Sequence, residues 1–310
     1  MINKENIHQQ IGFLSTSSTI IEEHGNARDS LKAESTHLDR PLIDVPRIIT
    51  GIKTEYEHIL CRVLCLSDEQ IWTCGYSGSI MRLYNLQGVL VKSIKTKSGN
   101  WQADITVTQS GDLVYTDEDD KTVNTVKNTQ IQTVIRLQGW RPVCVCSTSS
   151  GDLLVATVSD DNKQTKIVRY CDFTAKQSIQ YNYKGQALFS SGPYIKCIIE
   201  NRNLDICVVD SRAQYVVVVN QVGELLFIYN GFPSPSKPFK PVGVTTDSQS
   251  RILIADFNNR IHILDQEGKL LRYIDNCGLL RPVSVCVDSQ DNLFVAELSL
   301  CAVKKIQYCA

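Results

Sequence analysis

From residue 43 onward, the chain alternates between short apolar runs and clusters of turn residues. Apolar runs such as Ile252-Leu-Ile-Ala-Asp256 and Leu293-Phe-Val-Ala-Glu297 are separated by polar stretches such as Phe257-Asn-Asn-Arg260. Runs of this length, rich in Val, Ile and Leu and bounded by Gly, Asn, Asp and Ser, are typical of β-strands. This part of the chain is therefore predicted to be all β.

The β-rich part is built from repeated units. Taking the second predicted strand of each unit as the reference, the spacings between successive units are 42, 40, 53, 47 and 40 residues. A period of about 40 to 45 residues is the length of a four-stranded propeller blade. The pattern predicts a six-bladed β-propeller over residues 43–310. The reference positions are Ile71, Leu113, Leu153, Ile206, Leu253 and Leu293.

The last unit ends after its third strand, Ala302-Val-Lys-Lys-Ile306, and so lacks a fourth. The segment Arg47-Ile-Ile-Thr-Gly-Ile-Lys-Thr54 precedes the first unit and resembles the fourth strand Val91-Lys-Ser-Ile-Lys-Thr96. An unpaired edge strand invites aggregation, so a ring must complete its last blade. The N-terminal segment is predicted to supply the missing strand.

Residues 1–42 differ in composition from the rest. They hold one aromatic residue, Phe13, and many Ser, Thr, Glu and His residues without an alternating pattern. This composition predicts a largely disordered tail. Ile7, Ile11 and Leu14 have the spacing of a helical stripe, which fits either a coiled-coil remnant or an isolated helical turn.

The repeat pattern is clearest from Val244 to Ile261, which reads Val-Thr-Thr-Asp-Ser-Gln-Ser-Arg-Ile-Leu-Ile-Ala-Asp-Phe-Asn-Asn-Arg-Ile. This pattern resembles an NHL repeat, and the chain resembles the C-terminal half of tripartite-motif (TRIM) proteins with an NHL propeller, especially the molluscan TRIM-like set. In that family a RING ubiquitin-ligase domain, B-boxes and a coiled coil precede the propeller, which selects the client or binds RNA. This sequence lacks the RING and B-box, so the resemblance implies a ubiquitination adaptor and not a ligase.

Composition narrows the function classes. The net charge of −1 provides no strong attraction to nucleic acid or to an anionic membrane. The N-terminus lacks the pattern of a secretory signal, and no apolar stretch approaches the ~20 residues that span a bilayer. We therefore expect a cytoplasmic protein without membrane contact.

The 12 cysteines include no Cys-x-x-Cys pair, so a structural zinc module is not expected. Cys144 and Cys146 flank Val145 on a predicted strand and are expected to be buried apolar groups. A propeller enzyme with a channel zinc would need several histidines, and the propeller segment holds His58 and His262 alone. The sequence therefore predicts no metal, no cofactor and no catalysis. A metal-dependent hydrolase or lyase is the less favoured alternative.

In a four-stranded blade, the loops from the second to the third strand and from the fourth strand to the next blade lie on one face. Acidic and arginine residues recur there as predicted structural groups, the carboxylates capping turns and the arginines bridging blades: Asp117, Asp210, Asp256, Arg212 and Arg260. Freer basic and aromatic residues on the same loops are the predicted partner-binding set: Arg141, Lys196, Lys240, Arg281, Phe232, Phe239, Tyr194 and Lys163.

These features predict a non-catalytic binding platform. The mixed charges of the predicted face favour a protein client, and single-stranded RNA is the alternative, because basic residues could follow a phosphate backbone. The oligomeric state stays open.

Overall fold

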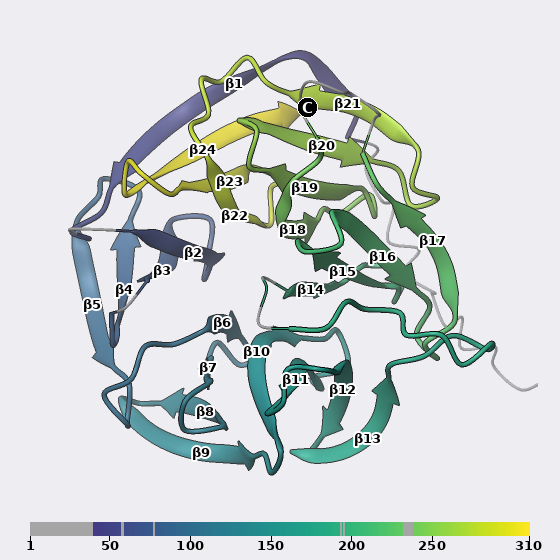
Figure 1. Ribbon diagram of the computed structural model, residues 1–310. Helices are drawn as coiled ribbons and strands as arrows, with labels where there is room; N and C mark the ends of the chain where they lie inside the picture. The colour runs from purple at the N-terminus through teal and green to yellow at the C-terminus, as the bar shows by residue number, and fades with distance from the viewer. Residues whose placement is uncertain (1–39, 57–58, 77, 193, 195, 232–237) are drawn as a thin grey trace, which may run out of the picture. The chain divides into compact units, whose positions relative to one another are not determined.

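The computed structural model describes residues 40–56, 59–76, 78–192, 194, 196–231 and 238–310. The predicted tail up to residue 39 and Phe232 lie outside these ranges. The described residues form six sheets of four antiparallel strands. Figure 1 shows the sheets arranged as blades around a central axis, which confirms the predicted six-bladed propeller.

Each blade runs outward from the axis through four strands. The first, innermost strands are β2 (Leu60–Cys65), β6 (Asp104–Val107), β10 (Trp140–Ser147), β14 (Lys196–Glu200), β18 (Pro241–Thr246) and β22 (Pro282–Val287). The second are β3 (Gln70–Gly75), β7 (Leu113–Asp117), β11 (Leu153–Ser159), β15 (Ile206–Asp210), β19 (Ile252–Asp256) and β23 (Leu293–Glu297). The third are β4 (Ile80–Asn85), β8 (Thr122–Lys127), β12 (Thr165–Cys171), β16 (Tyr215–Val219), β20 (Arg260–Leu264) and β24 (Ala302–Cys309). The outermost are β5 (Leu90–Lys95), β9 (Gln130–Arg136), β13 (Thr174–Ile179), β17 (Leu225–Tyr229), β21 (Leu270–Ile274) and β1 (Leu42–Lys53).

The second strands are buried on both faces, because neighbouring blades cover them. All five residues of β15, Ile206-Cys-Val-Val-Asp210, are buried, whereas the outer strand β17 is largely exposed. Strands covered on both faces read as continuous apolar runs instead of alternating ones. This is why the second strand is the most readable element in each repeat.

The register corrects one detail of the repeat frame. In blade 6 the first residue of the second strand, Leu293, pairs with Val287, and in blade 5 the equivalent pair is Ile252 with Thr246. The reference residue of the fifth unit is therefore Ile252 and not Leu253. Two adjacent apolar residues in a fully buried strand have similar hydropathy, so the sequence pattern does not distinguish them.

The first strand of the chain closes the ring. β1 pairs antiparallel with β24, Ile52 opposite Val303 and Ile48 opposite Ile306. Figure 1 shows β1 (purple) lying along β24 (yellow) at the outer edge of the last blade. The predicted closure by the N-terminal segment is thus confirmed.

Gly268 shows how tightly adjacent blades meet. It turns blade 5 from β20 to β21 with a φ of +85°, and an added Cβ would overlap the Phe227 ring of blade 4. Gly139 has a φ of +74°, and no atom lies within 4 Å of the position that a Cβ would take there. Alanine substitution at either glycine would strain the backbone, but only at Gly268 would it also create a steric overlap.

We expect Gly268→Ala to lower the free energy of unfolding by about 1–3 kcal/mol more than Gly139→Ala, because overpacking adds to the shared left-handed strain. Urea unfolding of the two variants measures this difference. Equal losses would mean that the Phe227 ring moves aside freely.

Candidate functional site on the top face and in the central channel

Two loops of each blade meet at one rim of the ring, here called the top face. They join the second strand to the third, and the outermost strand to the next blade. Four second strands end here in a buried carboxylate, from Asp117, Asp210, Asp256 and Glu297. Because the same position recurs in several blades, these groups form a ring of acids beneath the loops.

Each of these carboxylates ties its own turn or the incoming loop in place. Asp256 accepts hydrogen bonds from the backbone N–H of Asn258 (3.0 Å) and of Lys240 (3.2 Å). Burial alone would raise its pKa, but hydrogen bonds from His262, Asn258 and Arg260 lower the pKa of Asp256 to about 2. The carboxylate is therefore a charged structural clamp.

The other acids do the same. Asp117 accepts from the N–H of Asp120 at 2.9 Å, and Asp210 accepts from the N–H of Ala213 at 3.2 Å. Glu297 accepts from the N–H of Leu280 at 2.7 Å. The turn-capping geometry is the one that the sequence pattern predicts for Asp117, Asp210 and Asp256.

The arginines of the repeat act differently from the prediction. Arg260 pairs with Asp256 at 3.0 Å and lies over the Tyr273 ring, both within its own blade. Arg212 lies over the Tyr194 ring and donates to the carbonyl of Ser191 at 2.9 Å. The predicted bridging of neighbouring blades is therefore wrong for Arg260. Both guanidinium groups stack on aromatic rings beside the loops.

Two predicted contact residues are buried, which corrects the prediction for them. Lys196 is 1% exposed, and its Nζ lies 3.0 Å from Asp210 Oδ1. Phe239 is 4% exposed and packs against the rings of Tyr229 and His262. Lys196 begins an innermost strand, and its side chain points inward because it forms an ion pair with buried Asp210. The position of the lysine in the sequence does not indicate this pairing.

The remaining predicted contact residues lie on the top face. Lys163, Lys240 and Arg281 are exposed, and Tyr194 is 49% exposed. Arg141 is instead held between blades 2 and 3, because its Nη1 pairs with Glu118 Oε1 at 2.7 Å. Burial raises the pKa of Glu118 despite this partner.

Sequence reasoning missed that cations and rings pair around this rim. Lys166 Nζ lies 3.8 Å from the centre of the Trp140 ring, and Arg281 lies over the Phe257 ring. The Tyr76 and Trp101 rings pack at an angle of 53°, with centroids 5.4 Å apart, between blades 1 and 2. The sequence could have indicated this pairing, because these residues lie at or near the ends of predicted strands on the same rim.

The charges are distributed unevenly over the top face. In blades 2 and 3, exposed basic groups face exposed acids, as in the pairs Lys121–Asp160 and Arg136–Asp120. The repeat acids of blades 4 to 6 are buried, as is Asp117 of blade 2, and Asp275 is an exposed acid beside the basic loops. We call the basic and aromatic residues of blades 4 to 6 the basic arc: Tyr194, Arg212, Lys240, Phe257, Arg260 and Arg281.

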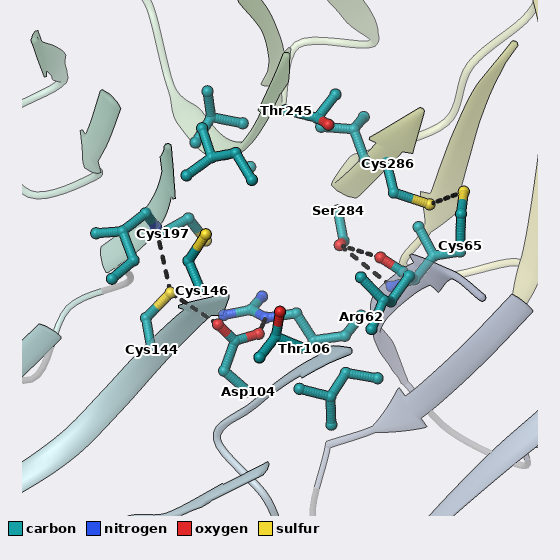
Figure 2. A pocket seen from close by; sticks show the side chains of 18 of the residues that line it. Arg62, Cys65, Asp104, Thr106, Cys144, Cys146, Cys197, Thr245, Ser284 and Cys286 are labelled. Atoms are coloured by element: carbon teal, nitrogen blue, oxygen red, sulfur yellow. Dashed lines mark hydrogen bonds and ion pairs between the residues drawn. The ribbon is translucent and has the colours of Figure 1, made fainter. Parts of the chain in front are cut away.

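The innermost strands line a cavity of about 290 Å³ along the axis. Figure 2 shows the Arg62 side chain extending along the wall of this channel to Asp104 of the neighbouring blade. Their Nε and Oδ1 atoms are 2.7 Å apart, and Asp104 Oδ2 also accepts from Cys144 Sγ at 2.7 Å. These two charges neutralise each other, and the exposed Arg202 also lines the cavity.

Cysteines form much of the rest of the channel wall. Cys144 and Cys146 are 1% and 3% exposed, so the predicted burial is confirmed. Cys65, Cys197 and Cys286 also line the cavity, and none of the twelve cysteines, all within the described ranges, is in a disulfide. The described residues contain no group of three or more His, Cys, Asp or Glu side chains arranged to hold a metal ion.

His262 lies away from the channel, in the third strand of blade 5. It is fully buried, with Nδ1 2.8 Å from the Tyr229 hydroxyl and Nε2 3.2 Å from Asp256 Oδ2. Burial lowers the pKa of His262. This histidine packs between blades 4 and 5, whereas His58 lies outside the described residues.

Comparison with solved structures finds propellers of several kinds. Virginiamycin B lyase from Staphylococcus aureus superposes with a TM-score of 0.61 at 12% identity, over 84% of this chain and 99% of that one. A luciferin-regenerating enzyme gives 0.62 at 13%, over 85% and 95%. The WD40 propeller domain of Doa1 gives 0.56 at 12%, over 84% and 96%.

The likeness is one of fold. At these identities, shared architecture says nothing of shared chemistry, because one propeller fold supports enzymes and binding domains alike. No family model matches the sequence, and no curated protein matches it. This six-bladed propeller also has no helix among its described residues with the length and apolarity to cross a membrane.

Proposed function

We propose that the chain is a non-catalytic binding platform whose basic arc engages an acidic segment of a protein partner. The observation that carries this proposal is the exposure of Arg212, Lys240 and Arg281 while the neighbouring repeat acids are buried. The guanidinium groups of Arg212 and Arg281 also lie over aromatic rings. Arginine and aromatic residues dominate the energetically important positions of protein interfaces. A carboxylate-rich partner would complement this arc.

The channel supports the top face as the contact surface. Its volume of about 290 Å³ is at the lower limit for a pocket that holds a small ligand. Arg62 and Asp104 already satisfy one another there. A macromolecular partner would therefore meet the loops and not the axis.

The repeat motif supports the same role. The Val244–Ile261 pattern resembles the NHL repeats of TRIM-NHL ubiquitin ligases, in which the propeller recognises the substrate. In this proposal the chain acts as the recognition part of such a system.

A charge-reversal experiment tests the proposal. We expect Arg212→Glu, Lys240→Glu and Arg281→Glu together to weaken binding of a Glu- and Asp-rich peptide library to the full chain by at least about tenfold. The matched control reverses three exposed lysines away from the top face, Lys127, Lys176 and Lys269. It changes the net charge equally and should leave binding within about twofold. Fluorescence polarisation measures both.

Single-stranded RNA is the alternative ligand, because it also binds basic grooves with stacking rings. The same variants should be titrated with a randomised single-stranded RNA pool at physiological salt. Salt-sensitive RNA binding that is lost in the arc variant, without peptide binding, would replace the protein proposal. Equal loss in both variants would contradict a specific top-face site for either ligand.

A further inference from the structure

The seam between the first and the last blade is held from inside the channel as well as by β1 outside. Here β2 of blade 1 lies beside β22 of blade 6. Ser284 Oγ accepts a hydrogen bond from the backbone N–H of Val63 at 3.2 Å and lies 3.5 Å from the carbonyl oxygen of the same residue. These contacts fix the two innermost strands against each other.

Two residues further along each strand, two thiols meet. The Sγ atoms of Cys65 and Cys286 are 2.6 Å apart, and Figure 2 shows them facing each other at the channel wall. Side chains two residues apart project from the same face of a strand, so this pair is the next rung after Val63 and Ser284. The strand alignment therefore places both sulfurs where a short movement would join them.

Other channel thiols have different partners. Cys144 Sγ donates to Asp104 Oδ2 at 2.7 Å, and Cys197 Sγ donates to the carbonyl of Val242 at 3.2 Å. The thiols of Cys65 and Cys286, by contrast, lie against each other. Cys144 and Cys197 also interact with each other, but each of them donates to an oxygen acceptor as well. Cys65 and Cys286 are the channel pair whose sulfurs meet at 2.6 Å.

We propose that Cys65 and Cys286 are a redox site that forms a reversible disulfide across the seam between blades 1 and 6. The oxidant class is a low-molecular-weight disulfide. One thiol loses its proton and attacks the oxidant, which gives a mixed disulfide and releases one thiol. The second cysteine then attacks the mixed disulfide, loses its proton and displaces the second thiol. Two protein thiols are oxidised, and the disulfide of the oxidant is reduced to two thiols.

The surroundings make this a slow reaction. Burial, followed by the contact with Cys286, raises the pKa of the Cys65 thiol well above its ordinary value. Because the thiolate is the attacking species, oxidation is expected over hours rather than seconds. Both sulfurs line the axial cavity, so a small oxidant can reach them from the channel.

The test exposes the native full chain to oxidised glutathione, followed by acid quenching, alkylation and tandem mass spectrometry. We expect a linked Cys65–Cys286 peptide and a loss of about 2 Da for the two hydrogens removed. The link joins residues 221 positions apart. It should therefore raise the melting temperature by roughly 5–10 °C, reversibly on reduction.

Matched variants test whether the disulfide joins Cys65 and Cys286. Cys65→Ser and Cys286→Ser should each abolish the link and the shift in melting temperature, whereas Cys144→Ser should keep both. Failure of the link after prolonged oxidation of the folded protein overturns the proposal. So does a stable glutathione adduct on one of the two cysteines, or a link elsewhere in the channel. None of these outcomes depends on the partner of the basic arc.

Discussion

Removing residues 42–53 should abolish the cooperative unfolding transition or lower the melting temperature by more than about 10 °C. These residues are β1, which completes blade 6 by pairing with β24. Without β1, the third strand of the last blade becomes an exposed edge, and the seam to the first blade loses its outer tie. Differential scanning calorimetry and light scattering would measure the loss of the transition and the expected aggregation.

A pair of substitutions within β1 separates the loss of packing from a general effect of truncation. Ile52 is 1% exposed and packs with Leu60 and Val303, whereas Ile49 on the same strand is 49% exposed. Ile52→Asp should cost at least about 3 kcal/mol, because it buries a charge without a partner. Ile49→Asp should stay within about 1 kcal/mol. Equal effects, or a truncated chain with an unchanged transition, would show that the ring does not depend on β1.

The second large effect is expected at the buried ion pair of blade 4. Asp210 is fully buried and accepts from Ser190 N–H and Oγ, both at 2.6 Å, as well as from Lys196 Nζ at 3.0 Å. Asp210→Ala would leave the lysine charge without its counterion and several donors without an acceptor. We expect it to lower the free energy of unfolding by about 3–5 kcal/mol.

Lys196→Met provides the internal comparison. This substitution leaves Asp210 with the hydrogen bonds from Ser190 and from the N–H of Ala213. The loss in the free energy of unfolding should therefore be roughly half of that for Asp210→Ala. Urea unfolding of both variants at neutral pH measures the asymmetry. Equal losses would mean that the ion pair alone matters and that the turn-capping bonds add little.

The same carboxylate should make stability depend on pH in the acid range. Burial alone would raise the pKa of Asp210, but Lys196 and the Ser190 donors outweigh burial and lower it. A lowered pKa means that this stabilisation is present above the pKa of the unfolded chain, about 3.9, and is lost as the pH falls through the lower folded value. Below about pH 4, the stability difference between wild type and Lys196→Met should therefore shrink.

The candidate site was only partly readable in advance. The loops that form the top face followed from strand order, and Lys240, Arg281 and Tyr194 are exposed there. Lys196, the first residue of β14, and Phe239, in the loop before β18, are buried instead, because an acid lies beside Lys196 and two rings pack against Phe239. The position of a residue in the repeat predicts that it lies on the top face. It does not predict which side chains pack beneath it.

The all-β class, the six units and the N-terminal strand that completes the last blade could be predicted from the sequence, because strand periodicity and repeat length are local properties of the chain. Which charged side chains are paired and which are exposed depends on the tertiary structure. Asp104 and Arg62 come from different blades, as do Cys65 and Cys286, and each pair meets because the ring brings innermost strands together. The contact between residues 42 positions apart depends on the packing of successive blades, and the contact between residues 221 positions apart depends on closure of the whole ring. No local pattern encodes either contact.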